Sequence, residues 1–211
     1  MTKLAWGAPG TRTYEAGVER GVLYAAGIAG VPWNGLIAVR EKLSGGTPNP
    51  YYLDGIKYLN LASGEEFEAT IDAFSSPREF DQCDGTSSIS NGLFVTQQTR
   101  KPFGMCYRTK VGNDSVGVDY GYKLHLVYNA LAAPTSHDNA TLTNTPAPLQ
   151  LSWSVSTLPI AIPTKKHTAH LIIDSSVAGV TRMTNVENLL YGTTTTAPRL
   201  PLPQELITLF A

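Results

Sequence analysis

Polar and apolar side chains alternate almost without interruption along the segment from Glu65 to Phe74. Successive side chains of a β-strand point to opposite faces, so this alternation predicts a strand with one dry face and one wet face. Acidic residues dominate the wet face, which we therefore expect to be negatively charged. The dry set is Phe67, Ala69, Ile71 and Ala73, and the wet set is Glu66, Glu68, Thr70 and Asp72.

A second local signal is the dipeptide Asp54-Gly55, which separates two short runs rich in apolar and aromatic residues. Both central residues of a type I′ turn need positive φ, which Asp-Gly tolerates, so the sequence predicts a tight β-hairpin. The expected register forms one cross-strand patch and leaves two side chains on the other face. It sets Leu53 opposite Ile56 and Tyr51 opposite Tyr58, while Tyr52 and Lys57 point away.

Further short segments with strand character follow, separated by Gly- and Pro-rich turns, and this punctuation is typical of an all-β fold. The segments 122–130 and 149–157 resemble ideal half-buried strands. The segment 169–175 is shorter and more apolar, and it predicts a central strand. The segments are 33–41, 92–98, 103–111, 122–130, 149–157 and 169–175. The apolar sides of the two half-buried strands are Tyr122, Leu124, Leu126 and Tyr128 in one and Leu149, Leu151, Trp153 and Val155 in the other.

Helix is predicted at only two places. The segment 184–192 places Thr184 and Glu187 at capping-box spacing and ends on Gly192, and its apolar face consists of Val186, Leu189 and Leu190. The segment 203–210 favours one or two further turns.

The composition indicates a single domain with a charge-poor surface. The chain has 211 residues, of which 16 are Lys or Arg and 17 are Asp or Glu, with a formal net charge of −1. Such a surface is either rich in Ser and Thr or covered in part by other subunits. Basic residues form no stripe that could neutralise phosphates, so tight nucleic-acid binding is not expected.

The chain shows no export signal and no run of about 18 apolar residues, so we expect a soluble protein made in a cytoplasm, without membrane contact. In that setting Cys83 and Cys106 are expected to remain free thiols.

The residue patterns predict no catalytic, cofactor or metal site, and hence no enzyme. His167 and His170 are three residues apart in a segment with strand character, where such a pair points to opposite sides. His125 is expected at the surface or in an interface. The chain has no G-x-S-x-G turn for a serine nucleophile, and its glycines do not follow a phosphate-binding spacing.

Several strings, distributed in order along nearly the whole chain, resemble the major tail protein of long-tailed, non-contractile bacteriophages, particularly those that infect actinobacteria. They include "APGTRTYEAGVERGVLY", "VPWNGL", "YYLDGIKYLN", "EFEATIDAF", "RKPFGMCYRTKVGND", "GYKLHLVYNALAAP" and "LLYGTTTTAPRLPLPQEL".

The resemblance implies a β-sandwich or partial barrel with one short flanking helix, spanning residues 1–211 as one tail-tube domain with terminal extensions and long inter-subunit loops. It implies a non-enzymatic virion protein that self-assembles into stacked hexameric rings, through which phage DNA passes without specific binding during genome ejection. The implied partners are further copies of the chain, the tape-measure protein, the tail tip and the tail terminator, and no cofactor is implied.

Two sets of residues become candidates for this role. If the wet face of 65–74 lines the channel, its carboxylates would repel DNA and let it slide; if it faces outward, they only meet solvent. The channel-facing candidates are Glu66, Glu68, Thr70 and Asp72. The connection 133–148 is too long for an ordinary hairpin and is a candidate inter-subunit arm. Its candidate residues are Pro134, His137, Asp138, Asn139 and Asn144.

An alternative class remains open. A β-sandwich binding module for carbohydrate or a receptor would stay small in solution and would expose a cluster of aromatic side chains on its loops, whereas Trp33 and Trp153 fall within predicted strands. A hydrolase is the third class, and it is disfavoured because the sequence offers neither a nucleophile nor a base.

Overall fold

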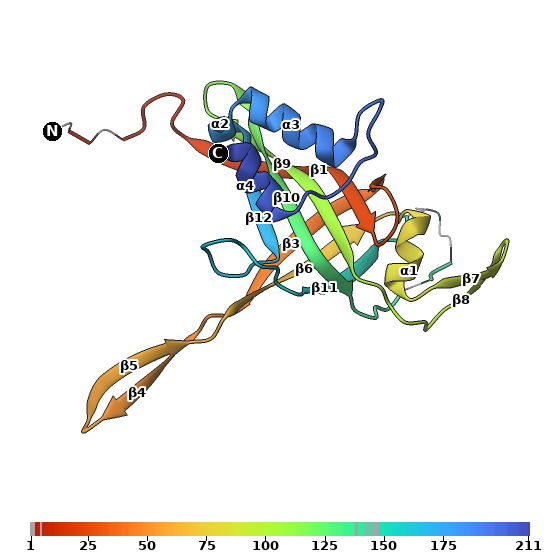
Figure 1. Cartoon of the computed structure of the whole chain (residues 1–211), viewed down its shortest axis with the longest axis horizontal. Helices are drawn as coiled ribbons and strands as arrows, with labels where there is room; N and C mark the ends of the chain where they lie inside the picture. Colours follow the sequence, from red (N-terminus) through yellow and green to blue (C-terminus); the bar gives the residue numbers. More distant parts are fainter. Residues whose placement is uncertain (1–2, 5, 138, 142–143, 145–147) are drawn as a thin grey trace.

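The computed structural model describes residues 3–4, 6–137, 139–141, 144 and 148–211. Its main sheet is antiparallel and runs in the order β2-β1-β9-β10-β11-β6-β3, with β12 also paired to β10 (Figure 1). The strands are β1 Thr13–Ala25, β2 Val31–Pro32, β3 Leu36–Gly45, β4 Pro48–Leu53, β5 Ile56–Ala62, β6 Glu65–Ala73, β7 Ser87–Ser90, β8 Leu93–Val95, β9 Phe103–Asn113, β10 Gly117–Ala132, β11 Leu151–Thr157 and β12 His170–Asp174.

The sheet curls so that its inner face forms one core, and the predicted all-β fold is confirmed. Ile71 of β6 shares this core with Leu23 of β1 and Met105 of β9, although β6 and β1 lie far apart in the strand order. Trp153 of β11 fills its centre against the rings of Trp33 and Phe80. Burial of these side chains is the main favourable term for folding.

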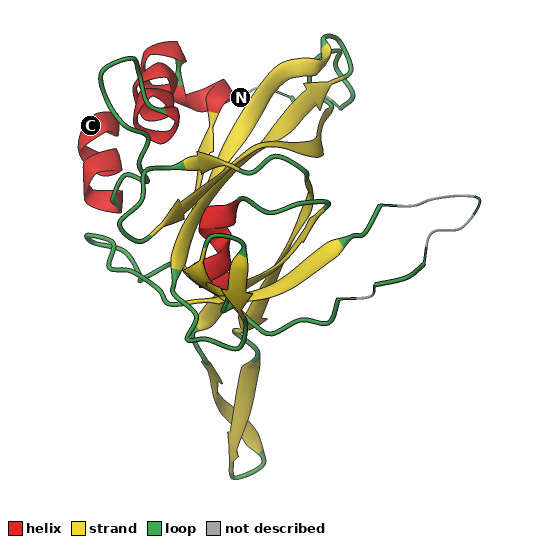
Figure 2. Cartoon of the chain, turned by 90° about the vertical axis from the view of Figure 1, so that its right-hand side faces the viewer, coloured by secondary structure: helices red, strands yellow, loops and turns green. Residues whose placement is uncertain are grey.

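A second core lies on the outer face of β1, β9, β10 and β12, where helices cover the sheet (Figure 2). The helical elements are η1 Arg78–Phe80, α1 Asp81–Asp84, α2 Ser175–Ala178, α3 Val180–Tyr191 and α4 Pro203–Phe210. The largest buried contributions from α3 and α4 are Met183, Val186, Leu190 and Leu206. Among the residues that the structure describes, no helix is long and apolar enough to cross a membrane.

The helix α3 confirms the predicted helix and its end at Gly192, but the predicted capping box is wrong. The helix begins four residues earlier, after Gly179, whose φ of 82° favours glycine. Thr184 therefore lies inside the helix, where its hydroxyl donates to the carbonyl of Val180.

Two strand predictions are corrected. The strand β10 was expected to be half-buried, but it is buried on both faces over much of its length because the inner core lies on one side and the helices on the other. The strand β12 was expected to be central, but within the described chain β10 is its only partner, so it is an edge strand.

The predicted hairpin is confirmed as β4 and β5, which project from the body as a two-stranded arm (Figure 1). Asp54 and Gly55 have φ of 50° and 76°, as a type I′ turn requires, and Leu53 pairs with Ile56. The pairing of Tyr51 with Tyr58 is wrong: a bulge shifts the register, and Tyr51 faces Leu59.

Both cysteines are free and buried, as expected. Cys83 lies in the inner core and Cys106 in the core beneath the helices. Burial raises the pKa of the Cys83 thiol to about 11 and raises the pKa of Cys106 further, so both thiols stay protonated and unreactive at neutral pH.

Candidate functional site

The acidic strand β6 has the predicted dry face, but its polar face is less wet than expected. Phe67, Ala69, Ile71 and Ala73 are all buried. On the other face Glu66 is exposed and Glu68 and Thr70 are half-buried. Asp72 was expected to be wet but is only 2% exposed. The reason is that β6 lies between β3 and β11, so Ala38 and Ser152 flank Asp72 on both sides.

The charge of this face is also partly neutralised by cations from β3. Arg40 forms an ion pair with Oδ2 of Asp72, an atom that has no other hydrogen-bond partner among the described residues. The Lys42 ammonium lies 3.3 Å from Glu68, which also accepts a hydrogen bond from Ser44. The Ser44 hydrogen bond, with help from Lys42, lowers the pKa of Glu68. Whether the face lines a channel stays a prediction.

The long connection between β10 and β11 leads outward from the sheet where it is described (Figure 2). Among its candidate residues Pro134, His137, Asn139 and Asn144 are exposed. Asp138 lies outside the described residues. Exposure alone does not test whether the connection contacts a neighbouring subunit, so the inter-subunit role stays a prediction.

The structure brings together one polar cluster that the sequence did not predict. It lies on the inner face of the curled sheet, where the edge strand β3 approaches β10 and β12. Four side chains form it: Glu41 of β3, Tyr107 of β9, His125 of β10 and His170 of β12.

Nδ1 of His125 contacts both the Glu41 carboxylate and the His170 imidazole. Nδ1 of His125 is 3.1 Å from Oε1 of Glu41 and 3.1 Å from Nε2 of His170. On its other side, Nε2 of His125 lies 3.0 Å from the Thr109 hydroxyl. The ring of Tyr107 stacks on His125 with an angle of 7° between planes, and its hydroxyl donates to Oε1 of Glu41 at 2.6 Å.

The local environment shifts the ionisation of these groups strongly. The hydrogen bond from His125, followed by that from Tyr107, lowers the pKa of Glu41 to about 2, although partial burial opposes the shift. Burial lowers the pKa of His170 to about 4 against the attraction of Glu41. Burial first, and then the bond to Glu41, raises the pKa of Tyr107 far above its ordinary value. At neutral pH the cluster therefore holds a carboxylate next to a neutral His170.

The position of His125 contradicts the expectation of a surface histidine, because only 4% of it is exposed. A signal was available in the sequence: Val127, two residues on, shares the face of His125 and lies in the inner core. His167 is exposed and precedes β12, so it does not join the cluster.

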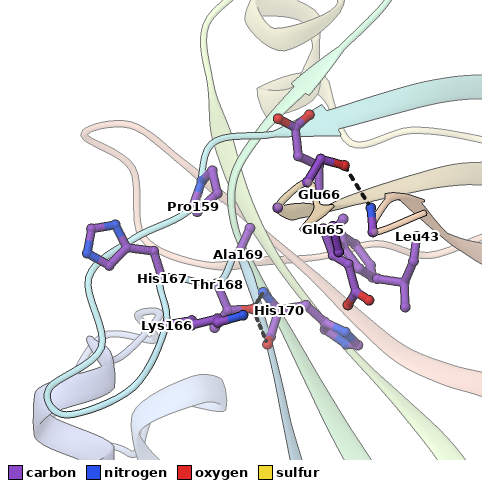
Figure 3. A pocket seen from close by; sticks show the side chains of 14 residues that line it. Leu43, Glu65, Glu66, Pro159, Lys166, His167, Thr168, Ala169 and His170 are labelled. Atoms are coloured by element: carbon purple, nitrogen blue, oxygen red, sulfur yellow. Dashed lines mark hydrogen bonds between the residues drawn. The ribbon is translucent and has the colours of Figure 1, made fainter. Parts of the chain in front are cut away.

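A depression of about 670 Å³ lies next to the cluster, between the base of the arm and the segment before β12. Figure 3 shows Leu43, Glu65 and Glu66 on one side and Lys166 and Thr168 on the other, with the ring of His170 extending from the second side toward Glu65. His170 belongs to both the depression and the cluster, so solvent approaches the cluster from the base of the arm.

No protein-family model matches this chain, and no curated protein matches its sequence. Among solved structures it is similar to a chain of the anti-feeding prophage baseplate, determined by cryo-electron microscopy with six-fold symmetry. That match has 8% identity and a TM-score of 0.39, and covers 81% of this chain and 97% of the other. A likeness this weak transfers neither function nor assembly.

Proposed function

We propose that this chain is a structural, non-enzymatic virion protein, namely the subunit of a bacteriophage tail tube. In this proposal the chain forms hexameric rings that stack into a conduit for DNA. The single observation that carries it is the β4–β5 arm, whose apolar side chains find no cover within the described chain. The large exposed ones are Tyr51, Tyr52, Leu53, Ile56, Tyr58 and Leu61, each between 52% and 73% exposed.

An isolated two-stranded hairpin is only marginally stable in water, and a concentration of large exposed apolar side chains is typical of an interaction surface. The arm has strand partners only within itself among the described residues, and Leu59 is its only half-buried residue. A neighbouring subunit would supply the missing cover. Since every copy carries the same arm, one such contact repeated around an axis closes a ring, and a second kind of contact can stack the rings.

The edges of the main sheet support the same assembly. Strand β3 pairs only with β6, and β12 pairs only with β10, so each leaves one side without a strand partner in the described chain. Such edges are aggregation hazards in a monomer but become useful when neighbours add strand to strand. The sequence resembles major tail proteins, and for this reason we propose a tail tube as the assembly. The tape-measure protein, the tail tip and the terminator are the further proposed partners.

Electron microscopy of the purified protein tests the proposal. We expect rings or tubes at high concentration, or after addition of a tail-tip complex as a nucleus. A matched variant with Leu53→Ser and Ile56→Ser should remain small, because it removes apolar surface and leaves the turn residues in place. A wild-type protein that stays monomeric by light scattering with a nucleus present would refute the tail-tube role.

One observation favours the alternative of a carbohydrate or receptor-binding module: three tyrosines gather on the arm, and aromatic rings commonly stack on sugars. They are Tyr51, Tyr52 and Tyr58. The molecular mass in solution distinguishes the two functions, since a binding module remains a small species in size-exclusion chromatography at every concentration.

A further inference from the structure

We propose that Glu41, His125 and His170 form a binding site for a divalent transition-metal ion of the Zn²⁺ type. One carboxylate oxygen and one nitrogen from each imidazole lie within 4.8 Å of one another. The inference does not depend on the tail-tube assembly, because all three side chains belong to one chain.

The distances fit a single small cation. Zn²⁺ binds imidazole nitrogen and carboxylate oxygen at about 2.0–2.2 Å, and tetrahedral geometry then separates neighbouring ligand atoms by about 3.4 Å. Nδ1 of His125 is 3.1 Å from both the Glu41 oxygen and the His170 nitrogen. The Glu41 oxygen and the His170 nitrogen lie within 4.8 Å of each other. Binding therefore requires the two imidazoles, which now face each other edge to edge, to turn so that both nitrogens and the carboxylate oxygen converge on the ion.

The surrounding hydrogen bonds orient the ligands for this purpose. Nε2 of His125 faces the Thr109 hydroxyl at 3.0 Å. When a metal ion replaces the Nδ1 proton that faces Glu41, the remaining ring proton stands on Nε2 and can be donated to Thr109. The Tyr107 hydroxyl donates to Glu41 and restrains the carboxylate. Such partners behind the ligands fix the tautomer and the orientation of a metal-binding group.

The chemistry of the donor set selects the kind of ion. Two imidazoles with one carboxylate suit Zn²⁺ and neighbouring transition metals, whereas Mg²⁺ and Ca²⁺ prefer oxygen ligands alone.

The site also has an entry path. The side chains of His125 and His170 are 5% and 11% exposed, but that of Glu41 is 36% exposed. Three protein ligands leave one tetrahedral position, which a water molecule can occupy from the Glu41 side. Because the ligands come from β3, β10 and β12, a bound ion would tie the edge strand that leads into the arm to the rest of the sheet.

Metal titration of untagged, chelator-treated protein tests the proposal. We expect one Zn²⁺ per chain by calorimetry and elemental analysis, and no binding of Mg²⁺. At a free Zn²⁺ concentration 100-fold above the dissociation constant, the thermal midpoint should rise by about 5–10 °C.

The variants Glu41→Gln and His170→Gln should each weaken Zn²⁺ binding by at least about 10–100-fold, the loss seen when even the partners of metal ligands are removed. The matched control is His167→Gln, which removes an exposed histidine outside the cluster and should bind like the wild type. Absence of stoichiometric binding, or equal affinity in all three variants, would overturn the proposal.

A measurement on the wild type covers the case in which a variant does not fold. Co²⁺ in the proposed site should give the intense visible absorption of a four-coordinate complex, and Zn²⁺ should shift the ring-nitrogen NMR signals of His125 and His170. Weak octahedral absorption together with unshifted nitrogens would mean that the cluster is only a hydrogen-bonded network.

Discussion

The curled sheet and the β4–β5 arm both carry apolar side chains on their strands, with opposite outcomes. On β6 the apolar set is buried, whereas on the arm Leu53 and Ile56 are 61% and 73% exposed. The difference lies in what faces each strand: β6 is backed by the inner core, and the arm has only its own second strand within the described chain. Apolar strand residues therefore indicate a surface that needs cover, but the rest of the fold decides whether one chain can provide it.

This contrast separates two kinds of substitution. A change in the inner core should alter the free energy of unfolding of the single chain, and a change on the arm should alter association instead. We expect the largest effect on unfolding from the inner core and the smallest from the solvent-accessible carboxylates of β6, Glu66 and Glu68.

Trp153→Ala should cause the largest loss. Trp153 is 1% exposed, and its ring centroid lies 5.1 Å from that of Phe80 and 5.8 Å from that of Trp33. Removing such a ring costs about 3–5 kcal/mol because the cavity closes only in part. Urea unfolding followed by fluorescence measures the loss, and a change below about 1 kcal/mol would contradict the described core.

Arg40→Gln should lower the free energy of unfolding by an intermediate amount, about 1–3 kcal/mol, because the nearly buried carboxylate of Asp72 would lose its cation. Urea unfolding measures this loss. Lys42→Gln is the matched control on the same strand: its partner Glu68 is accessible to solvent, so the loss should be distinctly smaller. Equal losses in the two variants would show that Asp72 is not buried as described.

The double change Leu53→Ser and Ile56→Ser should alter the unfolding free energy of the monomer by less than about 1 kcal/mol in the same measurement, since both side chains are exposed. The same variant should fail to assemble. If its free energy of unfolding is much lower than that of the wild type under conditions where both are monomeric, the arm packs against its own chain. The arm would then be covered as β6 is.

The features that the sequence predicted are local ones. The turn at Asp54-Gly55, the dry face of β6 and the end of α3 at Gly192 each depend on neighbouring residues alone. The start of α3 was missed because Thr184 and Glu187 matched a capping pattern by spacing while the helix already extended back to Val180.

The polar cluster could not be predicted, because it depends on how the sheet curls. Tyr107 lies 66 residues from Glu41, and His170 lies 45 residues from His125. No spacing rule relates residues on four strands whose contact requires β3 to approach β10 and β12. Asp72 was misjudged for a related reason: alternation gives its face, but the two flanking strands and Arg40 determine its burial.

Glu66→Lys combined with Glu68→Lys should affect folding least and addresses the polar face of β6 directly. Asp72 is left unchanged because a lysine could not replace a buried carboxylate there without unfolding the strand. Glu66 is exposed and Glu68 is half-buried, so the double variant should fold with a urea midpoint close to that of the wild type. The small loss that remains should come from losing the hydrogen bond that Ser44 donates to Glu68, and from repulsion between Lys42 and the positive charge introduced at position 68.

The functional effect of this double variant depends on where the polar face lies in the proposed tube. If it lines the channel, each reversal turns repulsion of DNA phosphates into attraction and is repeated around every ring, so genome ejection in vitro should be slow at low salt. Ejection should recover as salt rises, because the screening length falls from about 10 Å at 0.1 M to about 3 Å at 1 M. Tails that carry the variant and eject at the parental rate at every salt concentration would place this face on the outside, where Lys42 and Arg40 already balance much of its charge.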